Sequence, residues 1–474
     1  MEASRTVSEG DLQLDIEGLG PIVKGSVKIK PLTVFIGPNG SGKSYTAMFL
    51  YALYNGFIKK YFDLAWVNRH IYDFSRKDIR SLRNKRNYYS FISSRLKSLK
   101  KDAYEGLTTV FSDINNLVNV NSNSMKVSIS TKDIKYSISL KKGKKGEVSI
   151  EMPDKNSLIS LLEEKDKSWK IIRRGRYPKE YKVIELEAMS KSMFVLRRRF
   201  YYMPASRSGL IHAHRIVASA IVTAAPKLPF QEMPKLTGVV ADFIATLISI
   251  PDMIRYKGDI DNENEKESKE FRKNIKKVIK FLDDYILKGN IYVSDMKEFM
   301  YKSSDPELNI PVVNAASGIA ELAPLSLYLK YIIEPDDLLI LEEPESHLHP
   351  ELQRKVARLL AMLARAGVRV LITTHSDYLL HQINTLLLLS KLSGEDRKKF
   401  GYMENEFLNP NDVGAYLFKY DEEKKGYIIE ELPTIDEESN EPGIPEDALT
   451  EVAFAMGKEV SKITYMLEER SNDG

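Results

Sequence analysis

The 474-residue sequence contains no cysteine. Disulfides, thiolate zinc sites and cysteine nucleophiles are therefore excluded. The sequence also lacks a run of about 18 uncharged apolar residues, the length that a membrane-spanning helix needs. The nearest approach, from Leu236 to Ile250, carries Asp242. The first residues are polar and acidic, unlike a signal peptide. We therefore expect a soluble, cytoplasmic protein with no membrane partner.

Positive charge is concentrated in one middle segment. The net charge is only +4, but residues 71–200 carry 30 Lys and Arg against 15 Asp and Glu, a net of +15, which leaves −11 for the rest. Such a segment attracts polyanions. Within it, Tyr88, Tyr89 and Phe91 lie among arginines and lysines, and aromatic rings among cations can stack on bases. Two interpretations stay open: contact with DNA, or a solvated basic helical face with those rings buried against the rest of the protein.

The pattern of apolar residues indicates an α/β fold. An apolar strand at Leu32–Ile36 leads through a glycine-rich loop into a helix from Lys43 to about residue 55. The last third alternates between an apolar strand at 338–341, a helix from 350 to 366 closed by Gly367, and a strand at 368–373. This alternation predicts a parallel sheet. The other predicted elements are strands at 12–29 and 200–203, a β-meander from residue 125, and helices at 66–119, 157–164, 208–224, 237–249, 262–287 (with Gly289 as its C-cap) and 446–469.

The glycine-rich loop GPNGSGKS matches the phosphate-binding pattern G-x-x-x-x-G-K-[ST], with a strand before it and a helix after it. Its glycines let backbone N–H groups turn toward phosphates, and the helix N-terminus favours negative charge. We expect Lys43 to reach the β- and γ-phosphates and Ser44 to ligate Mg²⁺. The candidate nucleotide-binding residues are Gly37, Pro38, Asn39, Gly40, Ser41, Gly42, Lys43, Ser44 and Tyr45.

A nucleotide site of this kind also needs acidic residues at the end of another buried strand. Glu342 and Glu343 supply them: Glu342 is expected to orient the metal's water shell, and Glu343 to act as general base. The next strand ends at His375, where it can sense the γ-phosphate. The alternative is that LEEPESHLHP, with its three glutamates and two histidines, forms a metal-hydrolase site. That alternative is disfavoured, because adjacent side chains at a strand end point apart and the H-E-x-x-H spacing is absent.

The order of four segments resembles the ABC-type ATPase heads of the SMC, RecF and OLD-like group. These segments are GPNGSGKS, NAASGIAEL, LLILEEPESHLHP and LITTHSDYLL, and YMPASRS and NDVGAYLF are also similar to OLD-like ATPases. The resemblance implies a P-loop ABC-ATPase head: a mixed sheet core with flanking helices, an N-terminal β subdomain, and a basic helical and β-stranded insertion. The implied domains are a first lobe at 1–65, the insertion at 66–199, a head continuation with a helical arm at 200–300, and a second lobe at 301–474.

The resemblance also implies a mechanism. Two heads dimerise around two ATP molecules and Mg²⁺, and a signature loop containing Ser317 and Gly318 caps the γ-phosphate held by the other head. It assigns Glu342 as the Walker B acid, Glu343 as the catalytic base, His375 as the switch histidine and residues 346–349 as the D-loop.

The sequence departs from this pattern at three places. The Walker B acid is a glutamate where aspartate is commoner, and the signature is not LSGGQ, which counts against a transporter subunit. The Q-loop glutamine is also unassigned, because Gln231 lies far from a strand end. The pair Ser206 and Arg207, which follows the strand at 200–203, is the alternative for that place.

Two functions stay open for a homodimer, or a higher oligomer, joined through its ATP sites. The first is a DNA-dependent ATPase that clamps or senses DNA in repair or anti-phage defence. The second is a regulatory ATP switch that holds and releases a separate nuclease or toxin, with DNA contact secondary.

About 100 residues follow His375, so we expect no TOPRIM nuclease domain. The missing cysteines exclude a zinc hook, and the separation of Lys43 from Glu342 by about 300 residues disfavours a compact transporter domain.

If the basic segment contacts DNA, replacing Arg83, Lys85 and Arg86 together by alanine should weaken DNA binding and reduce its salt dependence, since fewer counterions are released. The measurement is the affinity for duplex DNA over a series of salt concentrations. An unchanged affinity would favour the solvated basic face.

Overall fold

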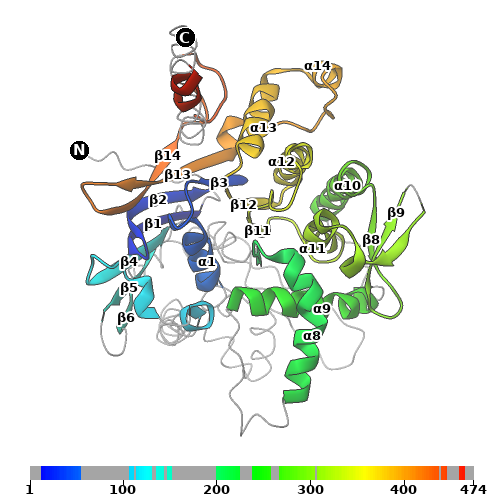
Figure 1. Ribbon diagram of the computed structural model, residues 1–474, viewed down its shortest axis with the longest axis horizontal. Coiled ribbons are helices and arrows are strands. Elements are labelled where there is room, and N and C mark those ends of the chain that lie inside the picture. The colour runs from blue at the N-terminus through cyan, green and yellow to red at the C-terminus, as the bar shows by residue number, and fades with distance from the viewer. Residues whose placement is uncertain are drawn as a thin grey trace, which may run out of the picture.

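Figure 1 shows a computed structural model in which one large sheet is flanked by helices. The structure describes residues 12–54, 106–111, 114–130, 135–142, 147–151, 199–224, 238–257, 266–304, 307–436, 439–445 and 458–464. Outside this part lie the aromatic and basic residues around Tyr88 and the helix predicted at 157–164. Most of the residues in the helices predicted at 66–119 and 446–469 also lie outside it. The division of the chain at residues 65, 199 and 300 stays a prediction.

Within the described residues, eleven strands form the large sheet. Strands β3 (Leu32–Ile36), β12 (Arg369–Thr374), β11 (Leu338–Glu342) and β7 (Phe200–Met203) run parallel side by side, and β13 (Val413–Asp421) pairs with β3 in parallel on the other side. The mixed α/β fold class is therefore confirmed. Across the sheet the order is β6 (Glu147–Glu151), β5 (Lys135–Lys141), β4 (Ser124–Ser130), β1 (Leu12–Leu19), β2 (Ile22–Ile29), β14 (Gly426–Leu432), β13 (Val413–Asp421), β3 (Leu32–Ile36), β12 (Arg369–Thr374), β11 (Leu338–Glu342) and β7 (Phe200–Met203).

The predicted β-meander forms, and it extends the same sheet. Strand β4 pairs antiparallel with β1, and β5 and β6 follow outward from it. These strands therefore continue the N-terminal β subdomain rather than standing apart from it in the basic segment. The alternation of apolar and polar residues in β4, which buries Met125, Val127 and Ile129, turns one face of the strand toward the core.

Helices cover both faces of the sheet (Figure 1). Alternate residues of the central strands enter two separate cores: Leu339 and Leu341 pack on the side of α10 to α13, whereas Leu338 and Ile340 pack with α1 and the N-terminal strands. A strand buried on both faces has to be apolar throughout, and this explains the run LLIL. The helices are α1 (Lys43–Leu53), α8 (Arg207–Ala224), α9 (Gly238–Lys257), α10 (Lys266–Phe281), the π-helix η4 (Leu282–Leu287), α11 (Ser317–Tyr331), α12 (Pro350–Arg365), α13 (Asp377–Leu388) and α14 (Gly394–Lys399).

The prediction that Gly289 caps the helix at 262–287 was wrong. The cap is Lys288, which adopts a left-handed conformation with φ 49°. Gly289 instead begins β8 (Gly289–Val293), part of a small sheet with β9 (Phe299–Ser303) and β10 (Asn309–Pro311). A Cβ at Gly289 would lie 2.5 Å from the carbonyl oxygen of Lys302, so the close approach of β9 requires glycine there.

None of the helices in the described ranges combines the length and the apolar character that crossing a bilayer requires.

Candidate nucleotide-binding site

The phosphate-binding loop joins β3 to α1 at the carboxyl edge of the parallel strands. Gly37, Gly40 and Gly42 have φ values of 144°, 75° and 103°, in the region that favours glycine. A Cβ at Gly37 would lie 2.5 Å from the carbonyl oxygen of Phe418, whereas nothing lies within 4 Å of a Cβ at Gly40. Gly40 is thus at the open mouth of the loop, and Gly37 fixes the loop against β13.

Lys43 is the first residue of α1, and its side chain is held by the loop itself. Its Nζ donates hydrogen bonds to the carbonyl oxygens of Gly37 at 2.7 Å and Pro38 at 2.8 Å. Burial lowers the pKa of Lys43, and the charges of Glu343 and Glu345 oppose that effect. The ammonium group therefore lies in the loop with acidic side chains nearby, where a phosphate oxygen could replace a carbonyl as its partner.

The two acids at the end of β11 have separate environments. Glu342 is buried, and its Oε2 accepts a hydrogen bond from the backbone N–H of Ala205 at 3.2 Å. Glu343 has a left-handed backbone with φ 41°, which is unfavourable for a residue other than glycine. Its N–H donates to the carbonyl oxygen of Thr373 in β12 at 2.9 Å. This hydrogen bond helps to hold Glu343 in its strained conformation. The Glu343 side chain therefore departs from the alternating side-chain directions of β11.

Both carboxylate oxygens of Glu343 accept hydrogen bonds. His375 Nε2 lies 2.8 Å from Oε1, and the Ser346 hydroxyl donates to Oε2 at 3.0 Å. The hydrogen bond with His375 lowers the pKa of Glu343, and the same contact raises the pKa of His375. At neutral pH Glu343 is therefore an ionised, oriented carboxylate.

Lys43, Glu343 and His375, predicted from separate segments, are therefore brought together. Ser317 and Gly318 are the first two residues of α11, which packs against α8 and α9 (Figure 1). The Ser317 side chain is exposed.

The residues of LEEPESHLHP have divergent partners. Glu345 is buried, and its Oε1 accepts from the Thr374 hydroxyl at 2.6 Å and from the His375 N–H at 3.1 Å. His349 caps α12, since its Nδ1 accepts from the N–H of Glu351. Within the described ranges, no three His, Cys, Asp or Glu side chains gather as a metal-binding group. Glu345 thus holds the end of β12 and the adjoining His375, a role that sequence analysis did not assign.

The donor set fits a nucleotide and Mg²⁺. Ser41 Oγ is buried and has no protein partner, so the loop contains an unused donor. Ser44, in the first turn of α1, and Glu342 offer the hard oxygen ligands that Mg²⁺ prefers.

Arg207 belongs to the pair that is the alternative to Gln231 for the Q-loop position. It follows β7, which is the parallel neighbour of β11, and begins α8. Its guanidinium is buried and donates to the carbonyl oxygens of Glu342 and Glu343. Gln231 lies outside the described residues, and the Q-loop assignment stays a prediction.

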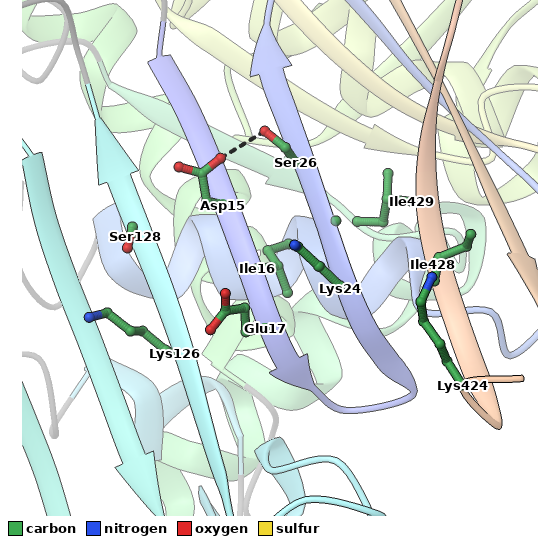
Figure 2. Close-up of a pocket in the computed structure, with 11 residues that line it drawn as sticks. Asp15, Ile16, Glu17, Lys24, Ser26, Lys126, Ser128, Lys424, Ile428 and Ile429 are labelled. Atoms are coloured by element: carbon green, nitrogen blue, oxygen red, sulfur yellow. Dashed lines mark hydrogen bonds between the residues drawn. The ribbon is translucent and has the colours of Figure 1, made fainter. Parts of the chain in front are cut away.

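A cavity of about 660 Å³ is lined by residues of β1, β2, β4 and β14 and of the turn before β14 (Figure 2). Asp15 in its wall accepts a hydrogen bond from the Ser26 hydroxyl at 2.8 Å. Charged groups of both signs line it: Asp15 and Glu17, with Lys24, Lys126 and Lys424. It contains none of the predicted site residues.

Comparison with known proteins gives a family match over most of the chain. Residues 13–380 match the family model described as an AAA ATPase domain. No curated protein matches the chain.

Solved structures with similar folds are heads of SMC proteins. One is an SMC head bound to the C-winged helix domain of ScpA, 10% identical, covering 89% of this chain and 97% of that chain with a TM-score of 0.40. Another is the SMC head domain from Thermotoga maritima, 12% identical, covering 89% and 98% with a TM-score of 0.35. A third is the Smc head with an extended coiled coil bound to the C-terminal domain of ScpA, derived from Pyrococcus furiosus, 12% identical, covering 95% and 98% with a TM-score of 0.38.

The Glu343–His375 contact predicts a specific titration. His375 should keep its proton above pH 6.5, its ordinary value, because Glu343 accepts its hydrogen bond. The ordinary pKa values of the two groups are 4.5 for glutamate and 6.5 for histidine. Between these two pH values the contact stabilises the protein fully. Its contribution is lost as the pH rises through the raised histidine pKa, or falls through the lowered glutamate pKa.

The measurement is an NMR titration of ¹³C-labelled histidine, with His375→Asn to assign the signal. Glu343→Gln should lower the pKa of His375. A pKa that is the same in both proteins would contradict the contact.

Proposed function

Because the chain belongs to the AAA ATPase domain family, we propose that it binds ATP and Mg²⁺ and hydrolyses ATP between two copies of itself. The observation that carries this proposal is the ionised Glu343 carboxylate, held between His375 and Ser346 in the same site as the phosphate-loop lysine. Such an arrangement provides a cation for the phosphates and a base for water.

The residues of the chain have separate roles in this reaction. Lys43 exchanges its carbonyl partners for phosphate oxygens, and the backbone of the loop orients the phosphates. Ser44 and Glu342 would hold Mg²⁺, which when bound neutralises charge on the β- and γ-phosphates. Glu343 accepts a proton from the attacking water. His375 keeps the carboxylate oriented and ionised before it does so.

The position of Ser317 supports assembly of the site from two chains. Ser317 is exposed at the N-terminus of a fifteen-residue helix, α11, where backbone N–H groups and the hydroxyl favour an anion. The γ-phosphate bound by one chain would therefore be capped by Ser317 and Gly318 of a second copy.

DNA is the polyanion that we propose the assembly senses, in repair or anti-phage defence. The net charge of +15 in residues 71–200 supports this. The second candidate is an ATP switch that holds a separate nuclease or toxin. It is supported by β13 and β14, which follow His375 along the chain and pair with β3 and β2, so these described strands belong to the ATPase sheet.

Two variants test the ATPase. Lys43→Ala should abolish ATP hydrolysis because it removes the cation for the phosphates. Glu343→Gln should retain ATP binding but lower kcat by about 10²–10⁴-fold, the range for loss of a general base. It should also accumulate as a dimer with ATP and Mg²⁺. Steady-state kinetics and light scattering after size exclusion measure both.

The matched controls are Lys399→Ala and Glu395→Gln, the same changes at exposed residues of α14. They should leave turnover unchanged. Normal turnover in Lys43→Ala would refute the ATPase assignment. A Glu343→Gln protein that binds ATP and stays monomeric would refute the shared site.

A further inference from the structure

We propose that Arg207 is a positioning residue that couples α11, the helix beginning at Ser317, to the acids at the end of β11. Through it, capture of the partner's ATP by Ser317 would be transmitted to Glu343 of the same chain. This inference rests on the proposed function. It assigns to one buried side chain the communication between the two ATP sites of a dimer.

Arg207 contacts three separate segments. One guanidinium nitrogen donates to the carbonyl oxygens of Glu342 and Pro204, the latter at 3.3 Å. The other donates to the carbonyl oxygen of Glu343 at 3.0 Å and lies 2.5 Å from Oε1 of Glu321 in α11. The planar guanidinium directs these donors at fixed angles, so the three segments are held in one arrangement.

The pair formed by Arg207 and Glu321 is fully buried. Their side chains are 1% and 0% exposed, respectively. Glu321 Oε2 also accepts a hydrogen bond from the N–H of Ser208 at 3.2 Å. A buried ion pair is a poor source of net stability, because apolar residues of similar volume fill the same space without desolvating charge. We therefore infer that the pair has a function other than stabilising the fold.

The contact on Glu343 is directed at a strained residue. Glu343 has φ 41°, and Arg207 bonds the carbonyl oxygen of that same residue. A movement of the guanidinium would therefore change the peptide that sets the direction of the Glu343 carboxylate. Arg207 does not touch the reacting groups itself; it acts through the backbone of Glu342 and Glu343.

In α11, Glu321 lies one helical turn from Ser317, the residue proposed to cap the ATP of the other chain. Glu321 follows Ser317 by four residues, so both lie on one side of α11, about 6 Å apart along its axis. A second contact joins α8 to the start of α11: His212 Nε2 lies 2.9 Å from the carbonyl oxygen of Val313, just before α11. A shift of the first turn of α11 would therefore displace Glu321 and, with it, Arg207.

The test uses the full-length chain and two alterations of the pair. Arg207→Met with Glu321→Met replaces both buried charges by apolar side chains of similar length, which is expected to preserve the fold. Arg207→Lys keeps the charge but cannot direct donors at all three segments. Each protein is assayed for its melting temperature, its ATP dissociation constant, and the kcat and Hill coefficient of ATP hydrolysis.

Wild-type protein should hydrolyse ATP with a Hill coefficient between one and two. Both altered proteins should bind ATP within about threefold of wild type, since the phosphate loop is intact, yet lose at least about tenfold in kcat. Their Hill coefficients should fall to about one. The double variant should melt below wild type, because the carbonyl oxygens bonded by Arg207 lose their donor, so turnover is compared at a temperature at which both proteins are folded.

Wild-type kcat and cooperativity in either altered protein would overturn the coupling. A wild-type Hill coefficient of one would overturn it as well. Failure of the proposed function gives a different result: the unaltered protein and Lys43→Ala would then have the same turnover. If the unaltered protein hydrolyses ATP and Lys43→Ala does not, the ATPase stands whatever the Arg207 variants show.

Discussion

Parallel pairing of four central strands is the constraint on which the site depends. The register sets Glu342 of β11 beside Thr373 of β12, and Thr374 of β12 beside Ile36 of β3. The carboxyl ends of these strands are therefore level, and the loops that leave them meet. Lys43, Glu343 and His375 come together because β3, β11 and β12 end at one edge, although the three residues are scattered over more than 300 positions.

The charged residues at this edge differ in their electrostatic surroundings. Lys43 is buried next to acids, Glu343 is ionised against His375, and Glu345 is buried with a raised pKa because burial disfavours its charge. Three glutamates within four positions thus have different partners, and Glu343 is more exposed than the other two. The surroundings of each glutamate, and not its residue type, distinguish the proposed general base, Glu343, from Glu345, which holds the end of β12.

The sequence was sufficient for the parts of the site that are local. GPNGSGKS predicts its loop because the glycine conformations, the preceding strand and the following helix all lie within about 20 residues. Strand-end positions likewise predicted where Glu342, Glu343 and His375 would lie. The pairing of Arg207 with Glu321 was not predictable in this way, because it joins the start of α8 to an apolar helix over 100 residues away. The pairing of β4 with β1 was missed for the same reason, since strand periodicity identifies a strand but not its neighbour.

The C-terminal hairpin of β13 and β14 separates two strands that are consecutive in the chain. Only Lys30 and Pro31 lie between β2 and β3, yet β14 pairs with β2 and β13 pairs with β3. During synthesis, the strand that carries the phosphate-binding loop therefore emerges nearly 400 residues before one of its partners. Such distant pairing slows folding, because the loop-closure entropy is lost before the contacts form. Completion of the sheet around the phosphate-binding loop thus waits until residue 432 has been synthesised, and a chain stopped before residue 413 would expose two unpaired strand edges.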